Sequence, residues 1–442
     1  MSTDAMSEVL TAPAVRLPPA VKGPKLLQGI GFGIMRRRFM DSMVRRHGNV
    51  FRVHIPVFGR VVVVCEPQLA RQIFTTSPEE LGNIQPNLSR LFGSGSVFAL
   101  DRDDHRRRRR LLAPPFHGKA MKKYEVVIEE ETLRETATWP EGQPFETLPS
   151  MNRITLNAIL RAIFGADGAE LDELRRIIPP WVTLGSRMAL MPQTKRNYGR
   201  YSPWGRLDNY RRQYDNVIDK LIAGERTDPN FEERTDVLAL MLRSTYDDGS
   251  VMSRKDIADE LLTLLAAGHE TTASTLAWAF ERITRHPEVL TALAEEVDTG
   301  GSELRQATIL EVQRVGNVID FAARQVHSPV YQLGEWSIPH GYSIMTCISK
   351  IHMNPEMFPD PNRFDPQRFV GTRPNPAAWI PFGGGTRRCV GAAFANMEMD
   401  VVLRTVLRDF TFETTDAPGE RWHNRGVAFI PKNGGRVVVH RR

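Results

Sequence analysis

Phe382-Gly-Gly-Gly-Thr-Arg-Arg-Cys389-Val-Gly391 is the stretch of this chain that decides the fold. The soft thiolate of a cysteine is a good iron ligand, and it stays ionised in electropositive surroundings. Gly383 to Gly385 allow a tight turn in which several peptide N–H groups converge on an anion. The helical pattern from Ala392 to Leu407 adds the partial positive charge of a helix N-terminus. The stretch therefore indicates a metal-binding thiolate loop, with a buried structural cysteine as the alternative.

The loop resembles the haem-binding loop of the cytochrome P-450 superfamily, which reads Phe-x-x-Gly-x-Arg-x-Cys-x-Gly, and every fixed position matches. The resemblance covers roughly residues 20 to 440 and implies a haem-thiolate monooxygenase of the soluble bacterial type. It implies haem b (iron protoporphyrin IX) as cofactor, with Cys389 as the axial ligand of the iron. It also implies that Arg387 binds a haem propionate.

A second motif, Ala267-Gly-His-Glu-Thr-Thr272, interrupts the apolar centre of a helix predicted from Asp256 to Arg285. Glycine and hydroxyl residues are unfavourable inside helices, and threonine side chains bond back to carbonyls of the preceding turn. In isolation the motif fits two interpretations equally well. It is either a catalytic acid beside a hydroxyl, or the N-cap of a second helix at Thr271 or Thr272.

The motif is similar to the Ala-Gly-x-Glu/Asp-Thr segment of the superfamily, and its position about 120 residues before Cys389 favours the catalytic interpretation. The resemblance implies that Thr271 hydrogen-bonds the bound oxygen and that Glu270 feeds protons to it. Both are therefore predicted catalytic residues. His269 stands at the variable position of the motif, where we expect packing or solvent contact in place of iron ligation.

Glu311-Val-Gln-Arg314 places a carboxylate and a guanidinium on one helix face, a pattern that is by itself common on surfaces. Together with the downstream Phe364-Asp-Pro-Gln-Arg368, it resembles the Glu-Arg-Arg network of the superfamily. We therefore assign these three charged residues the structural duty of holding the core behind the thiolate loop. The superfamily commonly has prolines after the first motif, whereas this chain has Val315-Gly-Asn-Val-Ile-Asp320.

Basic residues cluster in a further segment, Asp101 to Phe116, which contains His105 and a run of five arginines. His105 and Arg109 are four residues apart, so they share a helix face that could grip a carboxylate. The spacing resembles the propionate-binding pattern of the superfamily, as does the place of Arg324. We predict that His105, Arg109, Arg324 and Arg387 bind the two haem carboxylates. The other arginines of the run are expected to be solvated or to form a docking surface for an electron donor: Arg106, Arg107, Arg108 and Arg110.

The periodicity along the chain predicts a mainly α fold with small peripheral β-sheets, which is the character of the cytochrome P-450 fold. We predict a flexible N-terminal segment over residues 1–20 and a single catalytic domain over residues 21–442. Strands are predicted within residues 49–65 and near Tyr331–Trp336, Ser343–Ile348 and Val437–Val439. The predicted helices are about 104–112, 119–138, 150–165, 204–224, 234–243, 253–284, 287–298 and 303–316.

The composition of the 442 residues, 41% hydrophobic and 25% charged, is typical of a globular protein. Cys65, Cys347 and Cys389 have neither the spacing of a disulfide framework nor that of a zinc site, so we predict a cytoplasmic protein. Since no apolar run approaches the roughly 18 residues that span a bilayer, we predict no transmembrane anchor. Leu26 to Met35 is apolar and precedes three arginines, so peripheral membrane contact stays open.

The resemblance implies that the protein activates dioxygen and inserts one oxygen atom into its substrate. It also implies electrons from a separate ferredoxin and ferredoxin reductase. We expect a hydrophobic small-molecule substrate. Its pocket is predicted within residues Leu81–Phe98, Trp181–Met191, Leu261–Leu265 and Val427–Ile430.

Two other functions are considered: a haem-thiolate sensor without turnover, and a nucleic-acid-binding protein centred on the arginine run. Retention of both Glu270 and Thr271 argues against the sensor. The net charge of +6 comes without a nucleic-acid-binding motif, so we predict no nucleic-acid partner.

Overall fold

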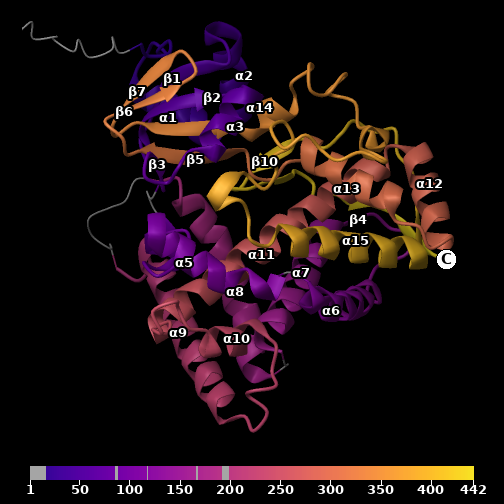
Figure 1. Cartoon of the computed structure of the whole chain (residues 1–442). Helices are drawn as coiled ribbons and strands as arrows, with labels where there is room; N and C mark the ends of the chain where they lie inside the picture. The colour runs from indigo at the N-terminus through magenta and orange to yellow at the C-terminus, as the bar shows by residue number, and fades with distance from the viewer. Residues whose placement is uncertain (1–15, 85–87, 117, 166–167, 192–198) are drawn as a thin grey trace, which may run out of the picture.

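The computed structural model describes residues 16–84, 88–116, 118–165, 168–191 and 199–442, and Figure 1 shows its course. Of the N-terminal segment predicted to be flexible, residues 1–15 lie outside this part. Residues 16–20 run along neighbouring strands. The carbonyl of Pro19 accepts the N–H of Arg52 at 2.7 Å, and the carbonyl of Arg16 accepts the N–H of Ser337 at 2.8 Å.

Helices form most of the described chain, which confirms the predicted mainly α character, and every predicted helix is present. The helices are α1 (Lys25–Ile34), α2 (Arg36–His47), α3 (Pro67–Thr75), α4 (Leu88–Phe92), α5 (Arg102–Leu112), α6 (Lys119–Thr136), α7 (Thr147–Phe164), α8 (Ala169–Met188), α9 (Pro203–Thr227), α10 (Val237–Arg243), α11 (Arg254–Ile283), α12 (Pro287–Asp298), α13 (Glu303–Val315), α14 (Ile348–His352) and α15 (Ala392–Asp409). Short 3-10 helices are η1 (Pro114–Phe116), η2 (Pro366–Phe369) and η3 (Gly385–Arg387).

The strands are short and form small sheets, as predicted. They are β1 (Val50–Ile55), β2 (Gly59–Val64), β3 (Leu81–Gly82), β4 (Phe145–Glu146), β5 (Phe321–Val326), β6 (Val330–Leu333), β7 (Trp336–Pro339), β8 (Ser343–Cys347), β9 (Phe410–Phe412), β10 (Trp422–Asn424), β11 (Phe429–Pro431), β12 (Arg436–Val437) and β13 (Val439–Arg441). The strand predicted near Tyr331–Trp336 is an antiparallel hairpin of β6 and β7.

The largest sheet has five strands in the order β1-β2-β8-β5-β3, with β2 and β8 parallel. Its strands β1, β2, β3 and β5 are labelled in Figure 1. β2 contains four consecutive valines that are fully buried, as expected for a strand covered on both faces. Val62 and Val64 pack with α3, whereas Val61 and Val63 pack with α1 and α2. The alternation of side chains along β2 therefore divides the core of this region into two layers.

β5 was not predicted, although it carries Arg324. Its sequence, Phe-Ala-Ala-Arg-Gln-Val, has few of the β-branched residues that favour strands. Pairing decides the strand instead, because β5 lies between β8 and β3 in antiparallel register, with Arg324 opposite Ile344. A strand of this kind is determined by its neighbours in space.

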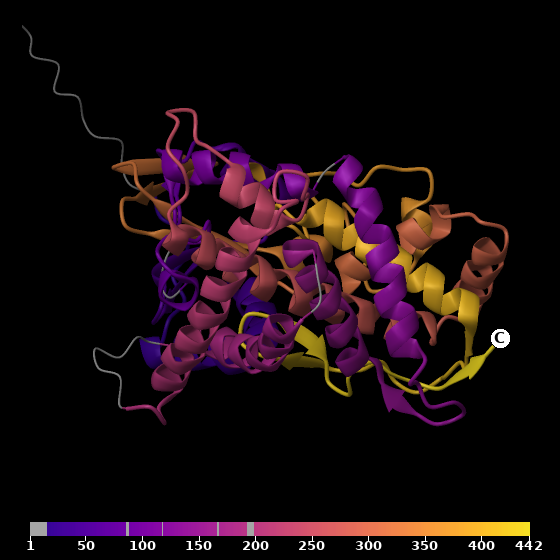
Figure 2. The same ribbon diagram turned by 90° about the horizontal axis from the view of Figure 1, so that it is seen from below.

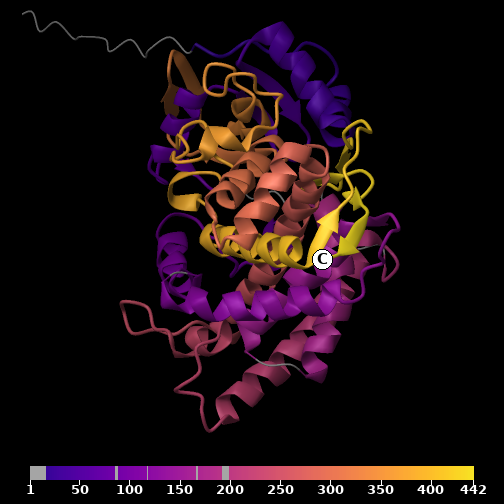
Figure 3. The same ribbon diagram turned by 90° about the vertical axis from the view of Figure 1, so that its right-hand side faces the viewer.

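The helical core is built around α11, which packs against α7 over much of its length. Nearly every residue of α11 is buried, and its buried acids Asp259 and Glu260 bond to groups of other segments. α15 packs on α6 at one side and on α12 and α13 at the other (Figure 3). α8 and α9 pack on each other at the end of the molecule far from the C-terminus (Figure 2).

α8 was also missed, because Pro179 and Pro180 lie inside it. A proline inside a helix costs about 3 kcal/mol, and two in succession predict an interruption. The helix nevertheless continues to Met188, since its inner face is buried in the core. The buried residues of that face include Leu171, Leu174, Ile177, Ile178 and Trp181.

The predicted Glu-Arg-Arg network is present and buried. The guanidinium of Arg314 donates to both carboxylate oxygens of Glu311 at 2.7 Å, and neither side chain is exposed. Arg368 donates to the same carboxylate at 3.3 Å. Arg314 also donates to the carbonyls of His352 and Pro361, at 3.0 and 2.8 Å. A buried charge pair requires such complete pairing, so the network ties distant segments of the chain together.

His352 continues this network toward the thiolate loop. Its Nδ1 bonds the carbonyl of Arg314 at 3.2 Å, and its Nε2 accepts the N–H of Ile380 at 2.9 Å. The ring is therefore a neutral tautomer with its proton on Nδ1. Burial lowers the pKa of His352 to about 3, so the ring stays neutral at neutral pH. Phe382, two residues beyond Ile380, begins the loop of Cys389.

Replacing this ring should change how stability depends on pH. The unfolded histidine titrates near pH 6.5 and the folded one about three pH units lower, so unfolding takes up a proton when the pH falls below about 6.5. Between about pH 7 and about pH 5.5, we expect the wild type to lose about 1 kcal/mol more unfolding free energy than His352→Gln. Urea unfolding of the haem-loaded proteins at both pH values measures this difference, and equal losses would contradict the assignment.

Candidate active site

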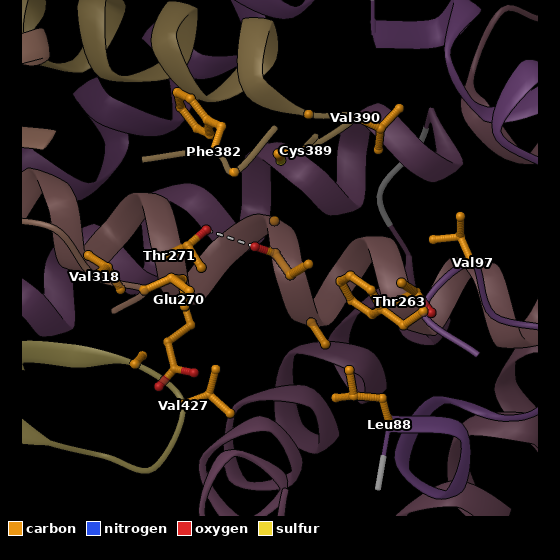
Figure 4. A pocket seen from close by; sticks show the side chains of 18 of the residues that line it. Leu88, Val97, Thr263, Glu270, Thr271, Val318, Phe382, Cys389, Val390 and Val427 are labelled. Atoms are coloured by element: carbon orange, nitrogen blue, oxygen red, sulfur yellow. Dashed lines mark hydrogen bonds between the residues drawn. The ribbon is translucent and has the colours of Figure 1, made fainter. Parts of the chain in front are cut away.

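A cavity of about 530 Å³ lies between α11, α5, α8, β5 and the thiolate loop. Figure 4 shows Cys389 on one side of it and Thr271 of α11 on the other. All seven residues predicted for the site line this cavity, although they come from distant parts of the sequence: His105, Arg109, Glu270, Thr271, Arg324, Arg387 and Cys389.

The thiolate loop is a tight turn held against α3. The N–H of Cys389 donates to the carbonyl of Phe382 at 3.0 Å and closes the turn. Gly385 has a φ of +66°, and a Cβ there would overlap the carbonyl oxygen of Phe74. The backbone can therefore approach α3 this closely only because the residue is glycine.

The thiol of Cys389 is open toward the cavity and enclosed by protein elsewhere. Burial raises the pKa of Cys389, while the N–H of Gly391 and the guanidinium groups of Arg109 and Arg388 oppose that rise. These groups alone do not bring the thiol to full ionisation at neutral pH. A metal cation bound to the sulfur would supply the missing positive charge, since coordination deprotonates thiols.

Basic side chains gather at one end of the cavity, as predicted. His105 is 3% exposed, and burial together with Arg387 and Arg109 lowers its pKa to about 3. Burial also lowers the pKa of Arg324 to about 10, with Arg387 as a second cause. Such mutual depression of pKa values indicates cations with too few anions beside them. The two carboxylates of a haem would supply that negative charge, so the residues present fit the group.

One acid of this region, Asp101, was not predicted. Its carboxylate accepts from Arg387 at 2.8 Å and from the N–H groups of Asn83 and Arg102 at 2.9 Å. Burial alone would raise the pKa of Asp101, but these partners lower it overall. An aspartate directly before a helix is a typical N-cap, and that signal could have located it. Asp101 holds Arg387 and the start of α5 together.

α11 turns one narrow face toward the cavity. Ala267, Gly268, Thr271 and Thr275 lie on that face and line the cavity. The Thr271 hydroxyl donates to the carbonyl of Ala267 at 2.8 Å (Figure 4). The helix is continuous from Arg254 to Ile283, so the alternative of a second helix beginning at Thr271 or Thr272 is wrong.

Glu270 leaves α11 in a different direction from Thr271. Its carboxylate points away from Cys389, toward Val427 (Figure 4). Arg425 lies 3.6 Å from Oε1, and among the described residues that oxygen has no hydrogen-bond partner. Burial raises the pKa of Glu270, and Arg425 opposes the rise. Burial thus favours the protonated form of this acid.

His269 packs inside the protein, which confirms one of the two roles expected for it. It is 3% exposed, and its Nδ1 lies 2.8 Å from the carbonyl of Leu265. Burial lowers the pKa of His269 to about 4, so the ring is neutral.

Arg108 contradicts the expectation that the rest of the arginine run is solvated. It is 4% exposed, donates to Glu260 of α11 at 3.1 Å and also donates to the carbonyl of Gly95. The other members pair with acids at the surface: Arg106 with Asp103 and Glu79, Arg107 with Asp248, and Arg110 with Asp247. Helix periodicity turns every third or fourth residue inward, so a run of five arginines must bury some of them.

The predicted pocket segments all contribute to the cavity. Residues 85–87 lie outside the described part of the first segment. The contributors within the four segments include Asn83, Ile84, Leu88, Leu91, Val97, Phe98, Trp181, Val182, Leu190, Leu262, Thr263, Leu264, Val427 and Ala428.

The sequence and the fold are shared with known proteins. The chain matches the family described as Cytochrome P450 over residues 19–436. The chain belongs to the cytochrome P450 family. It is 75% identical to cytochrome P450 138 of Mycobacterium tuberculosis over 441 residues, covering 99% of this chain and 100% of that protein. It is 36% identical to cytochrome P450 135B1 of the same species, covering 96% of this chain and 91% of that protein.

Among solved structures, a cyanobacterial cytochrome P450 with bound retinoic acid, CYP120A1, has the same fold. The TM-score is 0.85 at 22% identity, covering 97% of this chain and 100% of that chain. Proteins of this P450 family are haem monooxygenases whose iron protoporphyrin IX is held by a cysteine. The predicted enzyme class, fold and cofactor are therefore confirmed. Within the described residues, no helix is long and apolar enough to cross a membrane.

The buried position of Arg108 can be tested against a surface member of the same run. Arg108→Met leaves Glu260 buried without its partner, and loss of one member of a buried pair costs about 3 kcal/mol of unfolding free energy. Arg106→Met removes a side chain that is 39% exposed and should cost less than about 0.5 kcal/mol. Urea unfolding of both haem-loaded variants gives the comparison, and equal losses would refute the difference in burial.

Proposed function

We propose that this P450 uses Cys389 as the axial ligand of its haem iron and inserts one oxygen atom into an apolar organic substrate. The observation that supports this most strongly is the cavity itself, in which Cys389 lies opposite the part of α11 that carries Thr271. Of the three cysteines, all within the described residues, Cys65 and Cys347 are buried in or beside the large sheet, and neither lines the cavity. Bound haem with a thiolate ligand supplies the activation of dioxygen.

His105, Arg109, Arg324 and Arg387 would hold the two haem propionates. Three of them are guanidinium groups, which stay charged and bind carboxylates in a planar, bidentate geometry. His105 would donate a ring N–H to a propionate, and burial, Arg387 and Arg109 lower the pKa of this histidine to about 3. The ion pair with Asp101 holds the guanidinium of Arg387 in place.

Thr271 would act toward the cavity as a hydrogen-bond acceptor. Its single hydroxyl proton is used in the bond to the carbonyl of Ala267, so its free lone pairs can accept from a proton-bearing ligand. Donation toward the cavity would require it to give up that bond, which is worth about 1 kcal/mol. The bond to Ala267 thus orients the Thr271 hydroxyl to accept a hydrogen bond from the cavity side.

Glu270 would hold and deliver protons. Its raised pKa favours the protonated acid, and Arg425 stabilises the carboxylate that remains after a proton leaves. Because the carboxyl points away from Thr271, the proton would travel after rotation of the Glu270 side chain or through intervening water.

The substrate proposed is a hydrophobic small molecule. The wall away from the basic residues is formed mainly by apolar side chains, including Leu88, Phe92, Phe98, Leu264 and Val427. Such a wall binds by excluding water and has few groups that could recognise charge.

The electrons are proposed to come from a ferredoxin and its reductase. Among the described residues there is no group of three or more histidine, cysteine or acidic side chains that could hold a metal ion. Arg388 is exposed beside Cys389 and has no ion pair within the described structure, so it offers a docking charge close to the haem site. The unpaired state of all three cysteines supports the proposed location in the cytoplasm.

Removal of the proposed ligand provides the direct test. Cys389→Ala should abolish the thiolate-type absorption spectrum of the ferrous–CO complex, because no thiolate then faces the iron. Cys347→Ala, which changes a buried thiol outside the cavity, should keep it. An unchanged spectrum in the first variant would disprove the assignment of Cys389.

Turnover tests the distal residues. A compound panel is first titrated against the ferric protein to find a substrate, and electrons are then supplied by a ferredoxin and its reductase. Thr271→Ala should keep the haem but release hydrogen peroxide in place of product, whereas Thr271→Ser, which retains the hydroxyl, should restore most of the product formed per electron pair. Full product formation by Thr271→Ala would contradict the role of the hydroxyl. A wild type that binds the panel but never forms product would favour the sensor.

A further inference from the structure

α1 exposes an apolar face. Leu26, Leu27, Ile30 and Ile34 are 69%, 62%, 42% and 72% exposed, and the adjoining Met35 is 53% exposed. The opposite face of α1 is buried, where Gln28, Gly31 and Phe32 pack against the sheet region. Single exposed apolar side chains are ordinary, but several on one short helix mark an interaction surface.

The residues just before α1 and those of α2, which packs on α1, include many basic side chains. Lys22, Lys25, Arg38, Arg45 and Arg46 are exposed and make no ion pair within the described structure. The stretch from residue 16 to residue 47 contains a single acid, Asp41, and that carboxylate pairs with Lys350. An apolar helix face with uncompensated positive charge around it complements a bilayer that carries anionic headgroups.

The length of α1 fits a helix that lies on a bilayer. Its ten residues span about 15 Å, about half of the hydrocarbon thickness that a spanning helix must cross. Its apolar side chains can therefore enter only the outer part of a bilayer while the rest of the protein stays outside.

α1 also adjoins the wall of the cavity. The ring of Phe32 lies 6.5 Å from that of Phe58 and 5.7 Å from that of Phe321, and both of these line the cavity. The α1–α2 junction is joined to another part of the wall, because Arg36 donates to the carbonyl of Gly426, the residue before Val427. Contact with a bilayer at α1 would place the lipid one layer of side chains away from the cavity.

We propose that α1 is a docking surface for an anionic lipid bilayer. The exposed leucine and isoleucine side chains enter the interface, and the surrounding lysine and arginine side chains bind the headgroups. The inference is independent of the assignment of Cys389 or Thr271, since it concerns a surface outside the cavity.

Flotation of the haem-loaded, full-length protein with lipid vesicles tests the proposal. Vesicles of equal parts phosphatidylcholine and phosphatidylglycerol should bind the wild type, and pure phosphatidylcholine should bind it about tenfold more weakly. The triple variant Leu27→Ser/Ile30→Ser/Ile34→Ser should lose binding by about tenfold or more. The matched control, Val126→Ser/Leu133→Ser, removes exposed apolar side chains from α6 and should bind as the wild type does.

A second measurement keeps the test valid if the triple variant does not fold. Leu27→Cys labelled with a polarity-sensitive dye should shift its emission to the blue with anionic vesicles, whereas Val126→Cys should not. No binding by the wild type, unchanged binding by the triple variant, or equal shifts at both labels would overturn the proposal. A dimer that dissociates in the triple variant would overturn it in favour of self-association. Binding that emerges only after removal of residues 1–15 would overturn it for the intact chain.

Discussion

The buried ion pair of Glu311 and Arg314 is the constraint on which the rest of the site depends. Two charges without contact to solvent are tolerable only if every polar atom finds a partner, and here the partners are backbone groups of later segments. Those bonds place His352, and His352 in turn holds Ile380 at the entrance of the thiolate loop. The position of Cys389 therefore depends on the buried Glu311–Arg314 ion pair and its hydrogen bonds as well as on packing.

A second constraint acts from the other end of the loop. Gly385 lies so close to Phe74 that no side chain fits between them, and Arg387 is fixed by Asp101. Three contacts thus hold the loop: the hydrogen bond from Ile380 to His352 before it, the backbone contact of Gly385 with Phe74 within it, and the ion pair of Arg387 with Asp101 just before Cys389. Basic groups that lower one another's pKa lie at the same end of the cavity, so this end has more cationic than anionic side chains among the described residues.

Much of this site was predictable because its information is local. Glycines before Cys389, the acid and hydroxyl residues inside α11, and the spacing of His105 and Arg109 each encode a geometry within a few residues. Features decided by distant partners were not predictable in this way. β5 forms because it pairs with β8. α8 continues through two prolines because its inner face is buried in the core. Arg108 is buried because it forms an ion pair with Glu260 of α11.

The contacts of Arg108 have a mechanical consequence. Arg108 binds the carbonyl of Gly95, Asp259 of α11 accepts the N–H of the same glycine at 2.9 Å, and Ser96 bonds Thr263 at 2.7 Å. The segment that ends in Val97 and Phe98 is thereby fastened to the helix that carries Thr271. A substitution that displaces this wall of the cavity should therefore also displace α11, and with it Thr271.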